Sequence, residues 1–328
     1  MLFHIVLLAT AAFAAPFQKR ALSSNDQSVL DLALYLEHLE FALYYGGCNN
    51  FTDSAYTTAG FPNGFRENIC VIGMLLVLSH WLVRFQLNGW ALLAAQHEAA
   101  HIAAISSILA ANGATVNPPC TYNFQNTSPK DFVELASFIT NVGIGAYLGG
   151  SGLLTDNAIL EEVAASILTV EARHDTYLRT GIAASPFPSA FDTGLTATWA
   201  FNLAQMFVVS CPTQLPIVKL PTLNLLVASN QQLPGPTTTV GAFGWDPSQF
   251  FVAVDSAAPL YIAIVNQNIS APIFVPLNMT SSTTGTATLP QNITGAAFAC
   301  LTTFAGGLDL AALSSYGTLA GPVELLLL

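Results

Sequence analysis

Two stretches, Gln96-His97-Glu98-Ala99-Ala100-His101 and Thr169-Val170-Glu171-Ala172-Arg173-His174, carry the same Glu-x-x-His pattern. Both lie in segments with helical periodicity, where residues three apart share one face. A carboxylate and an imidazole on one face are able to bind the same metal ion. Two such pairs on two helices are typical of a dinuclear site inside a four-helix bundle.

The periodicity of apolar residues from about residue 26 to residue 210 predicts four long helices and an additional fifth helix. One long connection is expected between the second helix and the third. The expected helices are Asp26–Tyr45, Leu92–Ala111, Pro129–Leu148, 155–180 and Thr193–Val209. The expected N-caps are Asn25 or Asp26 for the first helix, Ser128 for the third and Thr155 or Asp156 for the fourth. Gly46-Gly47 and Gly149-Gly150 are expected to end the first and third helices.

The first and third helices are expected to complete the metal site. Glu37 precedes Tyr44 by seven residues, two helical turns, so both share a face, and Glu40 is close to that face. The third helix has Tyr147 at the equivalent place but Thr140 where a second Glu is expected. Because a hydroxyl is a poor iron ligand, one metal position is expected to be weak, completed by solvent or empty. Glu134 lies off this face and is a poor substitute.

The expected metal ligands are Glu37, Glu98, His101, Glu171 and His174. We expect Glu37 and His101 to favour one ion and His174 the other, with Glu98 and Glu171 between them. Such a ligand set suits iron or manganese. The expected neighbours of the ligands are Glu40, Tyr44, Thr140 and Tyr147, and both tyrosines fit an ordinary core equally well. His38 and His97 are expected at the surface or beside the ligands.

His97-Glu98-Ala99-Ala100-His101 also matches His-Glu-x-x-His, the zinc hydrolase signature. In that alternative His97 and His101 bind zinc and Glu98 is the general base. Convergence of Glu98, His101, Glu171 and His174 would count against it.

The composition excludes some functions. The chain has 328 residues, 52% of them hydrophobic and 8% charged, with eight Lys plus Arg and a net charge of −11. Nucleic-acid binding is excluded because there is no basic patch to neutralise phosphate. No apolar run is long and clean enough to require a stable membrane span.

The first 20 residues predict a signal peptide and a short pro-segment. Ile5–Ala12 is an apolar core, Ala12-Phe13-Ala14 fits a cleavage site and Lys19-Arg20 fits a second cut; the alternative is a buried first helix. Glycosylation sequons begin at Asn50, Asn126, Asn268, Asn278 and Asn292. We expect a secreted, extracellular glycoprotein, either free or associated with the cell wall. Of five Cys residues, Cys70 is the candidate for the unpaired one.

The segment 71–86 is apolar on every face and interrupts the approach to the second helix. Because Val codons begin with GT and a Gln codon is CAG, an unspliced short intron is one hypothesis. A buried helix and a membrane-touching hairpin are the alternatives. Sequencing the transcript tests the intron hypothesis, because an intron is excluded if every mature message contains these codons.

From residue 211 to residue 328 the sequence predicts a small all-β, sandwich-like domain. Apolar runs such as Phe250–Val254 and Leu260–Val265 alternate with turn-forming clusters, and Val323–Leu328 reads as a final strand. This region has no His, so any chemistry is expected in the helical part, residues 21–210.

The helical part resembles the ferritin-like domain family of fungal secreted proteins, which includes stress-response and late sexual-development proteins. It is also similar to plant desiccation-related proteins. The resemblance rests on Leu36–Glu40, Gln96–His101, Pro119–Phe124, Asn141–Gly149 and Thr169–His174. It implies a ferritin-like bundle able to hold two iron ions, with iron-dependent oxidation as one expected activity. A structural surface glycoprotein with a decayed metal site is the alternative that Thr140 favours.

Overall fold

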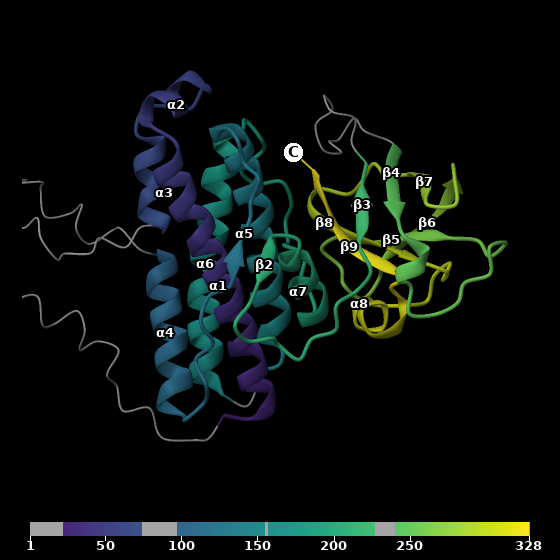
Figure 1. Ribbon diagram of the computed structural model, residues 1–328, viewed down its shortest axis with the longest axis horizontal. Coiled ribbons are helices and arrows are strands. Elements are labelled where there is room, and N and C mark those ends of the chain that lie inside the picture. Colours follow the sequence, from purple (N-terminus) through teal and green to yellow (C-terminus); the bar gives the residue numbers. More distant parts are fainter. Residues whose placement is uncertain (1–21, 74–96, 155–156, 227–239, 328) are drawn as a thin grey trace, which may run out of the picture.

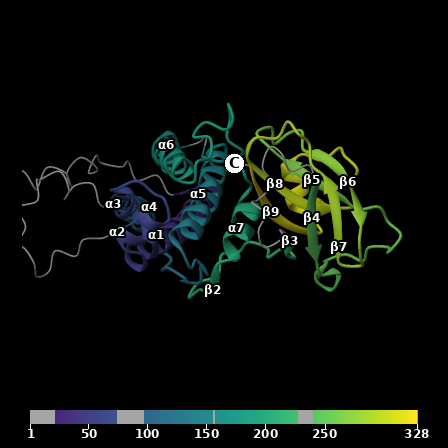
Figure 2. The same ribbon diagram turned by 90° about the horizontal axis from the view of Figure 1, so that it is seen from above.

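The computed structural model describes residues 22–73, 97–154, 157–226 and 240–327. A helical bundle forms one end of the molecule and a β domain forms the other (Figure 1). The helix α7 (Ala197–Gln205) lies between them, in contact with α5 of the bundle and β9 of the sheet (Figure 2). This confirms the predicted ferritin-like bundle with an extra helix, followed by an all-β domain.

Four long helices make up the bundle: α1 (Ser24–Asn50), α4 (His97–Ala111), α5 (Pro129–Ser151) and α6 (Ala158–Gly181). They run side by side in Figure 1. Two short helices, α2 (Asp53–Thr58) and α3 (Phe65–Gly73), follow α1. α1 and α5 are buried on more than one face, since every residue of Leu32–Glu37 and of Ile139–Gly145 is buried.

The helix starts follow side-chain capping. The hydroxyl of Ser23 accepts from the backbone N–H of Asp26, whose carboxylate accepts from the backbone N–H of Ser23. The expected caps Asn25 and Asp26 are therefore wrong, because both residues already lie inside α1. Ser128 caps α5 as predicted. The described residues begin again at Asn157, which caps α6; Thr155 and Asp156 lie outside them.

The glycine pairs do not end their helices where expected. α1 continues through Gly46 and Gly47 to Asn50, and a Cβ on Gly47 would lie 2.2 Å from the ring of Phe132. α5 likewise continues to Ser151, and a Cβ on Gly149 would meet the carbonyl oxygen of Leu195. These glycines allow close packing of neighbouring segments rather than a change of chain direction.

The fifth helix is shorter than the predicted Thr193–Val209. Thr193 lies in the irregular segment before α7, where its hydroxyl donates to the carbonyl of Ala296 and accepts from the N–H of Gln267. After α7, the short strand β2 (Val208–Ser210) pairs with β1 (Thr121–Tyr122). Tertiary hydrogen bonds therefore replace helical ones at both ends of the expected helix.

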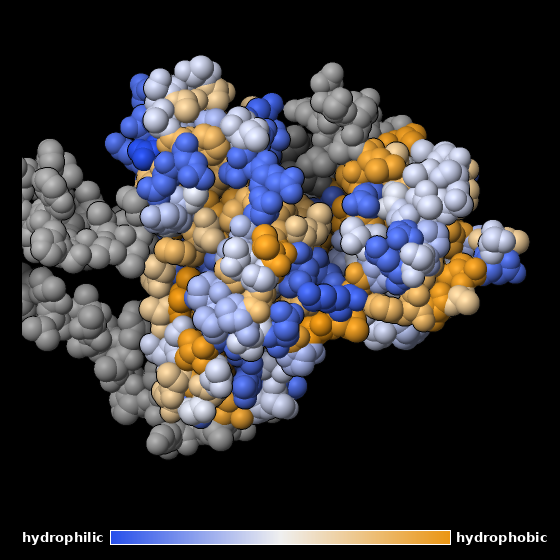
Figure 3. Space-filling model, viewed as in Figure 1, coloured by the Kyte–Doolittle hydropathy of each residue, from blue (hydrophilic) through white to orange (hydrophobic). Residues whose placement is uncertain are grey.

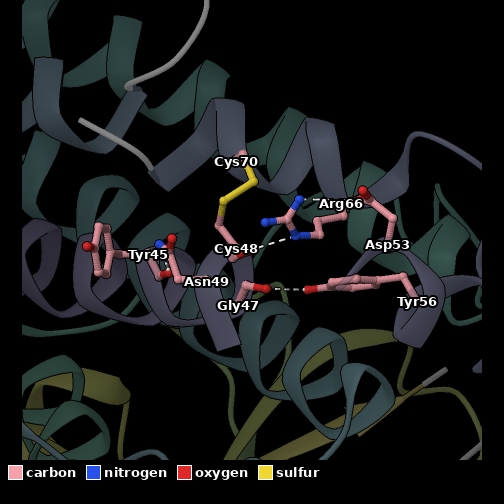
Figure 4. Close-up of a disulfide and its surroundings, with 8 residues drawn as sticks. All are labelled: Tyr45, Gly47, Cys48, Asn49, Asp53, Tyr56, Arg66 and Cys70. Atoms are coloured by element: carbon pink, nitrogen blue, oxygen red, sulfur yellow. Dashed lines mark hydrogen bonds and ion pairs between the residues drawn. A yellow bond between two sulfur atoms is a disulfide. The ribbon is translucent and has the colours of Figure 1, made fainter. Parts of the chain in front are cut away.

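The cysteine prediction is wrong. Cys70 on α3 is bonded to Cys48 on α1 (Figure 4), Cys120 is bonded to Cys211, and the free cysteine is the buried Cys300. Arg66 donates to the carbonyl of Cys48 beside the first disulfide. Sequence spacing does not report distances between helices, and α3 packs on α1 only in the folded chain.

The β domain is one seven-stranded antiparallel sheet, in the order β3-β4-β7-β6-β5-β8-β9. Its strands are Leu223–Leu225, Val240–Trp245, Tyr261–Val265, Ile273–Met279, Thr284–Thr288, Gly295–Thr302 and Ala320–Leu327, for β3 to β9 in chain order. The two edge strands approach each other, and the N–H of Gly321 donates to the carbonyl of Pro221. The sheet therefore curves into a nearly closed barrel rather than two separate layers.

Two of the three expected strands are present. β5 and β9 correspond to Leu260–Val265 and Val323–Leu328, although Leu328 itself lies outside the described residues. Phe250–Val254 is irregular, with Phe251 and Val252 exposed, so the strand predicted there is wrong. A 3-10 turn (Pro247–Gln249), capped by Asp246, precedes this segment, which has no partner strand among the residues that the structure describes.

The surface is mixed in polarity, with hydrophobic and hydrophilic residues interspersed on the face in Figure 3. Within the described residues, α5 alone is long and apolar enough to cross a membrane, and 67% of its most apolar window is buried inside the protein. Its composition is that of a core helix. The predicted signal and pro-segment, 1–20, lie outside the described residues, as do 74–86 of the anomalous segment.

A candidate metal centre between the helices

The bundle brings polar side chains from α1, α4 and α6 into its interior. All five expected ligands are buried: Glu37, Glu98, His101, Glu171 and His174. Glu98 and Glu171 have exposed fractions of 0%. Charged groups in such surroundings are costly unless they are paired or bind a cation.

One cluster surrounds His101. Ligand atoms of Glu37, Glu98, His101 and Glu171 all lie within 4.8 Å of one another. The Nδ1 atom of His101 is 3.1 Å from Oε2 of Glu37, and 3.3 Å from both Oε2 of Glu98 and Oε1 of Glu171. Three carboxylates therefore converge on one imidazole.

A second imidazole faces the same two central carboxylates. The Nδ1 atom of His174 is 3.3 Å from Oε1 of Glu98 and 3.2 Å from Oε2 of Glu171. Each of these carboxylates thus directs one oxygen toward each imidazole. This is the arrangement that two bridging carboxylates need between two ions.

The donor set fits a pair of metal ions. Among the residues that the structure describes, neither oxygen of Glu98 nor Oε1 of Glu171 has a hydrogen-bond donor. Buried carboxylate oxygens without a donor are rare in folded proteins. Hard oxygen ligands with one imidazole per position suit iron or manganese. The chemistry of the residues present therefore matches the expected cofactor class.

The electrostatics are those of crowded acids around two imidazoles. Burial and the neighbouring Glu171 raise the pKa of Glu98 well above its usual value. Burial also opposes ionisation of Glu171, but the neighbouring imidazoles, first His174 and then His101, outweigh it and hold its pKa well below the usual range. Burial opposes the charge on His101, yet Glu37 and the other carboxylates raise its pKa.

Two tyrosines connect α1 and α5 beside the cluster. Tyr147 donates to Oε1 of Glu37, and the hydroxyl of Tyr44 lies 2.7 Å from Oγ1 of Thr140. Burial raises the pKa of each phenol well above its usual value, so both stay protonated. The expected neighbours thus lie at the site, with Thr140 turned toward Tyr44.

His97 lies behind His174 rather than among the carboxylates. Its Nδ1 is 2.8 Å from Nε2 of His174, and the two rings are nearly parallel, at 11°. Burial and then His174 lower the pKa of His97 to about 4, so it is neutral and able to fix the orientation of His174. His38 contacts the carbonyl of Asn117 instead, and Glu134 pairs with Lys130.

This geometry does not favour the zinc hydrolase alternative. Glu98, His101, Glu171 and His174 converge, which is the outcome expected to count against it. His97, the required second zinc ligand, contacts His174 through Nδ1. Glu98 lies between two imidazoles rather than free to act as a base.

Comparison with known proteins agrees with the fold of the helical part. Residues 25–184 match the family described as "Ferritin-like domain". They form a ferritin-like domain. The chain is also similar to "Protein rds1" of the yeast Schizosaccharomyces pombe, at 24% identity over 82% of this chain and 70% of that protein. The predicted resemblance to a fungal ferritin-like family is thereby confirmed.

The sequence underestimated one residue of the ferritin-like domain. Glu40 is 2% exposed, and its carboxyl group contacts that of Glu171. Burial, followed by Glu171, Glu98 and Glu37, raises its pKa well above the usual value. Its spacing of three residues from Glu37 was the available signal.

A second polar cluster, next to the ligands, was also missed. Asp175 follows His174 in the chain and accepts from the hydroxyl of Ser137 at 2.6 Å and from the side-chain amide of Asn141 at 3.2 Å. Burial raises the pKa of Asp175 to about 6. These hydrogen bonds join α6 to α5 next to the Glu/His cluster.

An apolar cavity of about 280 Å³ adjoins the domain without containing the cluster. Residues of α1, α5, α7 and the β domain line it, among them Leu36, Tyr147, Leu195 and Leu310. Tyr147 thus lies between this cavity and Glu37. Among the described residues that line the cavity, Asp309 alone carries a carboxylate, so the candidate metal site is the Glu/His cluster rather than this cavity.

Proposed function

We propose that this protein binds two metal ions, iron or manganese, inside its ferritin-like domain. The observation that carries the proposal is the position of Glu98 and Glu171, each with one oxygen within 3.3 Å of each imidazole Nδ1. Acidic side chains packed against one another in the interior destabilise the fold unless a cation offsets their charge. A pair of divalent ions offsets their charge.

Bound iron would supply oxidation chemistry with dioxygen, which makes iron-dependent oxidation the activity that we propose. The protein's own contribution is positional. Tyr147 holds Glu37, His97 holds His174, and the surrounding helices keep bulk water away from the carboxylates. A role in stress response or development is proposed on the family resemblance alone.

We further propose that the protein is exported and glycosylated. The two disulfides fit an oxidising compartment. Of the five sequon asparagines, Asn50, Asn268, Asn278 and Asn292 are exposed and Asn126 is half-buried. A loss of mass on treatment with peptide N-glycosidase, together with an N-terminus near Ala21 in the culture medium, tests this. Retention inside the cell with an intact N-terminus would contradict it.

Elemental analysis by plasma mass spectrometry tests the metal proposal. The full-length protein is purified from its producing host without chelators or metal-affinity resin, and its metal content per chain is compared with that of two variants. His101→Gln removes a proposed ligand. His38→Gln is the matched control, because His38 lies on α1 but contacts the carbonyl of Asn117.

We expect two iron or manganese ions per chain in the unmodified protein and in His38→Gln. We expect these ions to be lost in His101→Gln. Zinc alone would favour the hydrolase alternative. No metal after incubation with ferrous iron or manganese would overturn the proposal. It would leave a structural glycoprotein, the function that Thr140 favours.

A further inference from the structure

The helices α1 and α5 face the cluster as two unequal halves of one pattern. On each helix a tyrosine follows the site position by seven residues, as Tyr44 follows Glu37 and Tyr147 follows Thr140. Each tyrosine reaches the site position of the opposite helix, Tyr147 at Glu37 and Tyr44 at Thr140. The two helices therefore occupy equivalent places around the site, but only α1 offers a carboxylate at this position.

One turn further along, α1 again carries a glutamate and α5 does not. Three residues after Glu37 stands Glu40, and three residues after Thr140 stands Gly143. A Cβ on Gly143 would lie only 2.3 Å from Oε1 of Glu40. The carboxyl group of Glu40 therefore occupies the space that a side chain at position 143 would need, on the face of α5 that carries Thr140.

Glu40 is placed among the ligands with few partners of its own. It is 2% exposed, its carboxyl group contacts Glu171, and Oε2 has no hydrogen-bond partner within the described ranges. Three further acids surround it, Glu171, Glu98 and Glu37. An acid buried against other acids costs stability unless a cation shares the site.

We propose that Glu40 supplies the carboxylate that Thr140 lacks, so that the second metal position is built from Glu40, Glu98, Glu171 and His174. Glu37, Glu98, Glu171 and His101 then form the first position. This inference rests on the proposed metal binding.

The number and type of the ligands support the assignment of Glu40 to the second metal position. A dinuclear bundle site takes one Glu from each of two helices and a Glu-x-x-His pair from each of the other two. Here both single carboxylates come from α1, and α5 contributes the gap at Gly143. Four carboxylates and two imidazoles are retained, and the four negative charges balance two divalent ions.

The test is the number of Mn²⁺ ions bound per chain in the full-length protein, with the paramagnetic resonance spectrum of the bound ions as a second readout. Glu40→Gln keeps the shape of the side chain and removes its charge. Glu162→Gln, on the exposed face of α6, is the control. Thr140→Glu combined with Glu40→Gln returns a carboxylate to the site from α5. Circular dichroism of each metal-free variant checks folding.

We expect two bound ions and a spin-coupled spectrum in the unmodified protein and in Glu162→Gln. Glu40→Gln should keep one ion and bind the second at least about 100-fold more weakly, with loss of the coupled spectrum. The double variant should regain the second ion. Unchanged binding of two ions in Glu40→Gln would overturn the assignment of Glu40, and a folded double variant that binds one ion would overturn the equivalence of positions 40 and 140. Failure of the unmodified protein to bind Mn²⁺ or Fe²⁺ would instead overturn the proposed function.

Discussion

The hydroxyl of Tyr44 on α1 lies 2.7 Å from Oγ1 of Thr140 on α5. Across the same interface, Tyr147 on α5 donates to Glu37 on α1. The two phenols are related by position but have different partners, a neutral hydroxyl and a carboxylate. This difference predicts that the two tyrosines contribute unequally to metal binding.

Tyr147→Phe is expected to weaken binding of the first metal ion by about 10-fold, because Glu37 loses the donor that orients it. Tyr44→Phe should change metal affinity by no more than about 3-fold, because Tyr44 contacts Thr140 rather than a carboxylate. Titration with Mn²⁺ measures both. Equal losses in the two variants would show that the tyrosines act only through packing.

Glu40→Gln is expected to stabilise the metal-free protein by about 1–2 kcal/mol at neutral pH. The reason is that burial and the neighbouring acids raise the pKa of Glu40, so folding near neutral pH requires this group to take up a proton, which an amide does not need. Denaturation by urea in the presence of a chelator gives the free energies of unfolding. A loss of stability in the variant would mean that the Glu40 carboxyl group holds the bundle together without metal.

Glu324 on β9 predicts a pH dependence of stability. It is 3% exposed, and neither carboxyl oxygen has a hydrogen-bond partner within the described part of the chain. Burial, with Asp175 adding to it and Arg179 opposing it, raises its pKa well above the usual value. The folded protein therefore holds this proton more tightly than the unfolded chain, so Glu324 favours folding below its unfolded pKa of about 4.3 and loses this contribution as pH rises toward the folded pKa.

Glu324→Gln should remove that loss, since an amide does not titrate. Between about pH 4 and about pH 7 the variant should gain stability relative to the unmodified protein, by about 1.4 kcal/mol for each pH unit until the native pKa is reached. Glu161→Gln, exposed on α6, is the control. Parallel stability curves for Glu324→Gln and the unmodified protein would contradict the shifted pKa.

The Cys48–Cys70 bond is expected to contribute about 3 kcal/mol to the free energy of unfolding, given its separation of 22 residues. The double variant Cys48→Ser/Cys70→Ser should lose that amount in non-reducing denaturation. In the unmodified protein a thiol reagent should find one reactive group after unfolding, Cys300, and none before. Three reactive thiols after unfolding would contradict the pairing.

The sequence by itself determined the helical site and the order of the two parts. Glu98/His101 and Glu171/His174 were predictable because a spacing of three residues places side chains on one helical face whatever the helix packs against. For the same reason, the seven-residue spacing predicted that Glu37 and Tyr44 share one face of their helix, and that Thr140 and Tyr147 share one face of theirs. These are local periodicities, which the backbone geometry enforces.

Only the tertiary structure decided which distant residues meet. The pairing of Cys70 with Cys48, the shortened α7 and the space at Gly143 that Glu40 fills all depend on contacts between separate elements. The strand wrongly predicted at Phe250–Val254 shows the same limit, because a β-prone run forms a strand only where a partner strand is in reach. Periodicity sets the direction of a side chain, whereas packing sets its neighbours, and the second metal position depends on those neighbours.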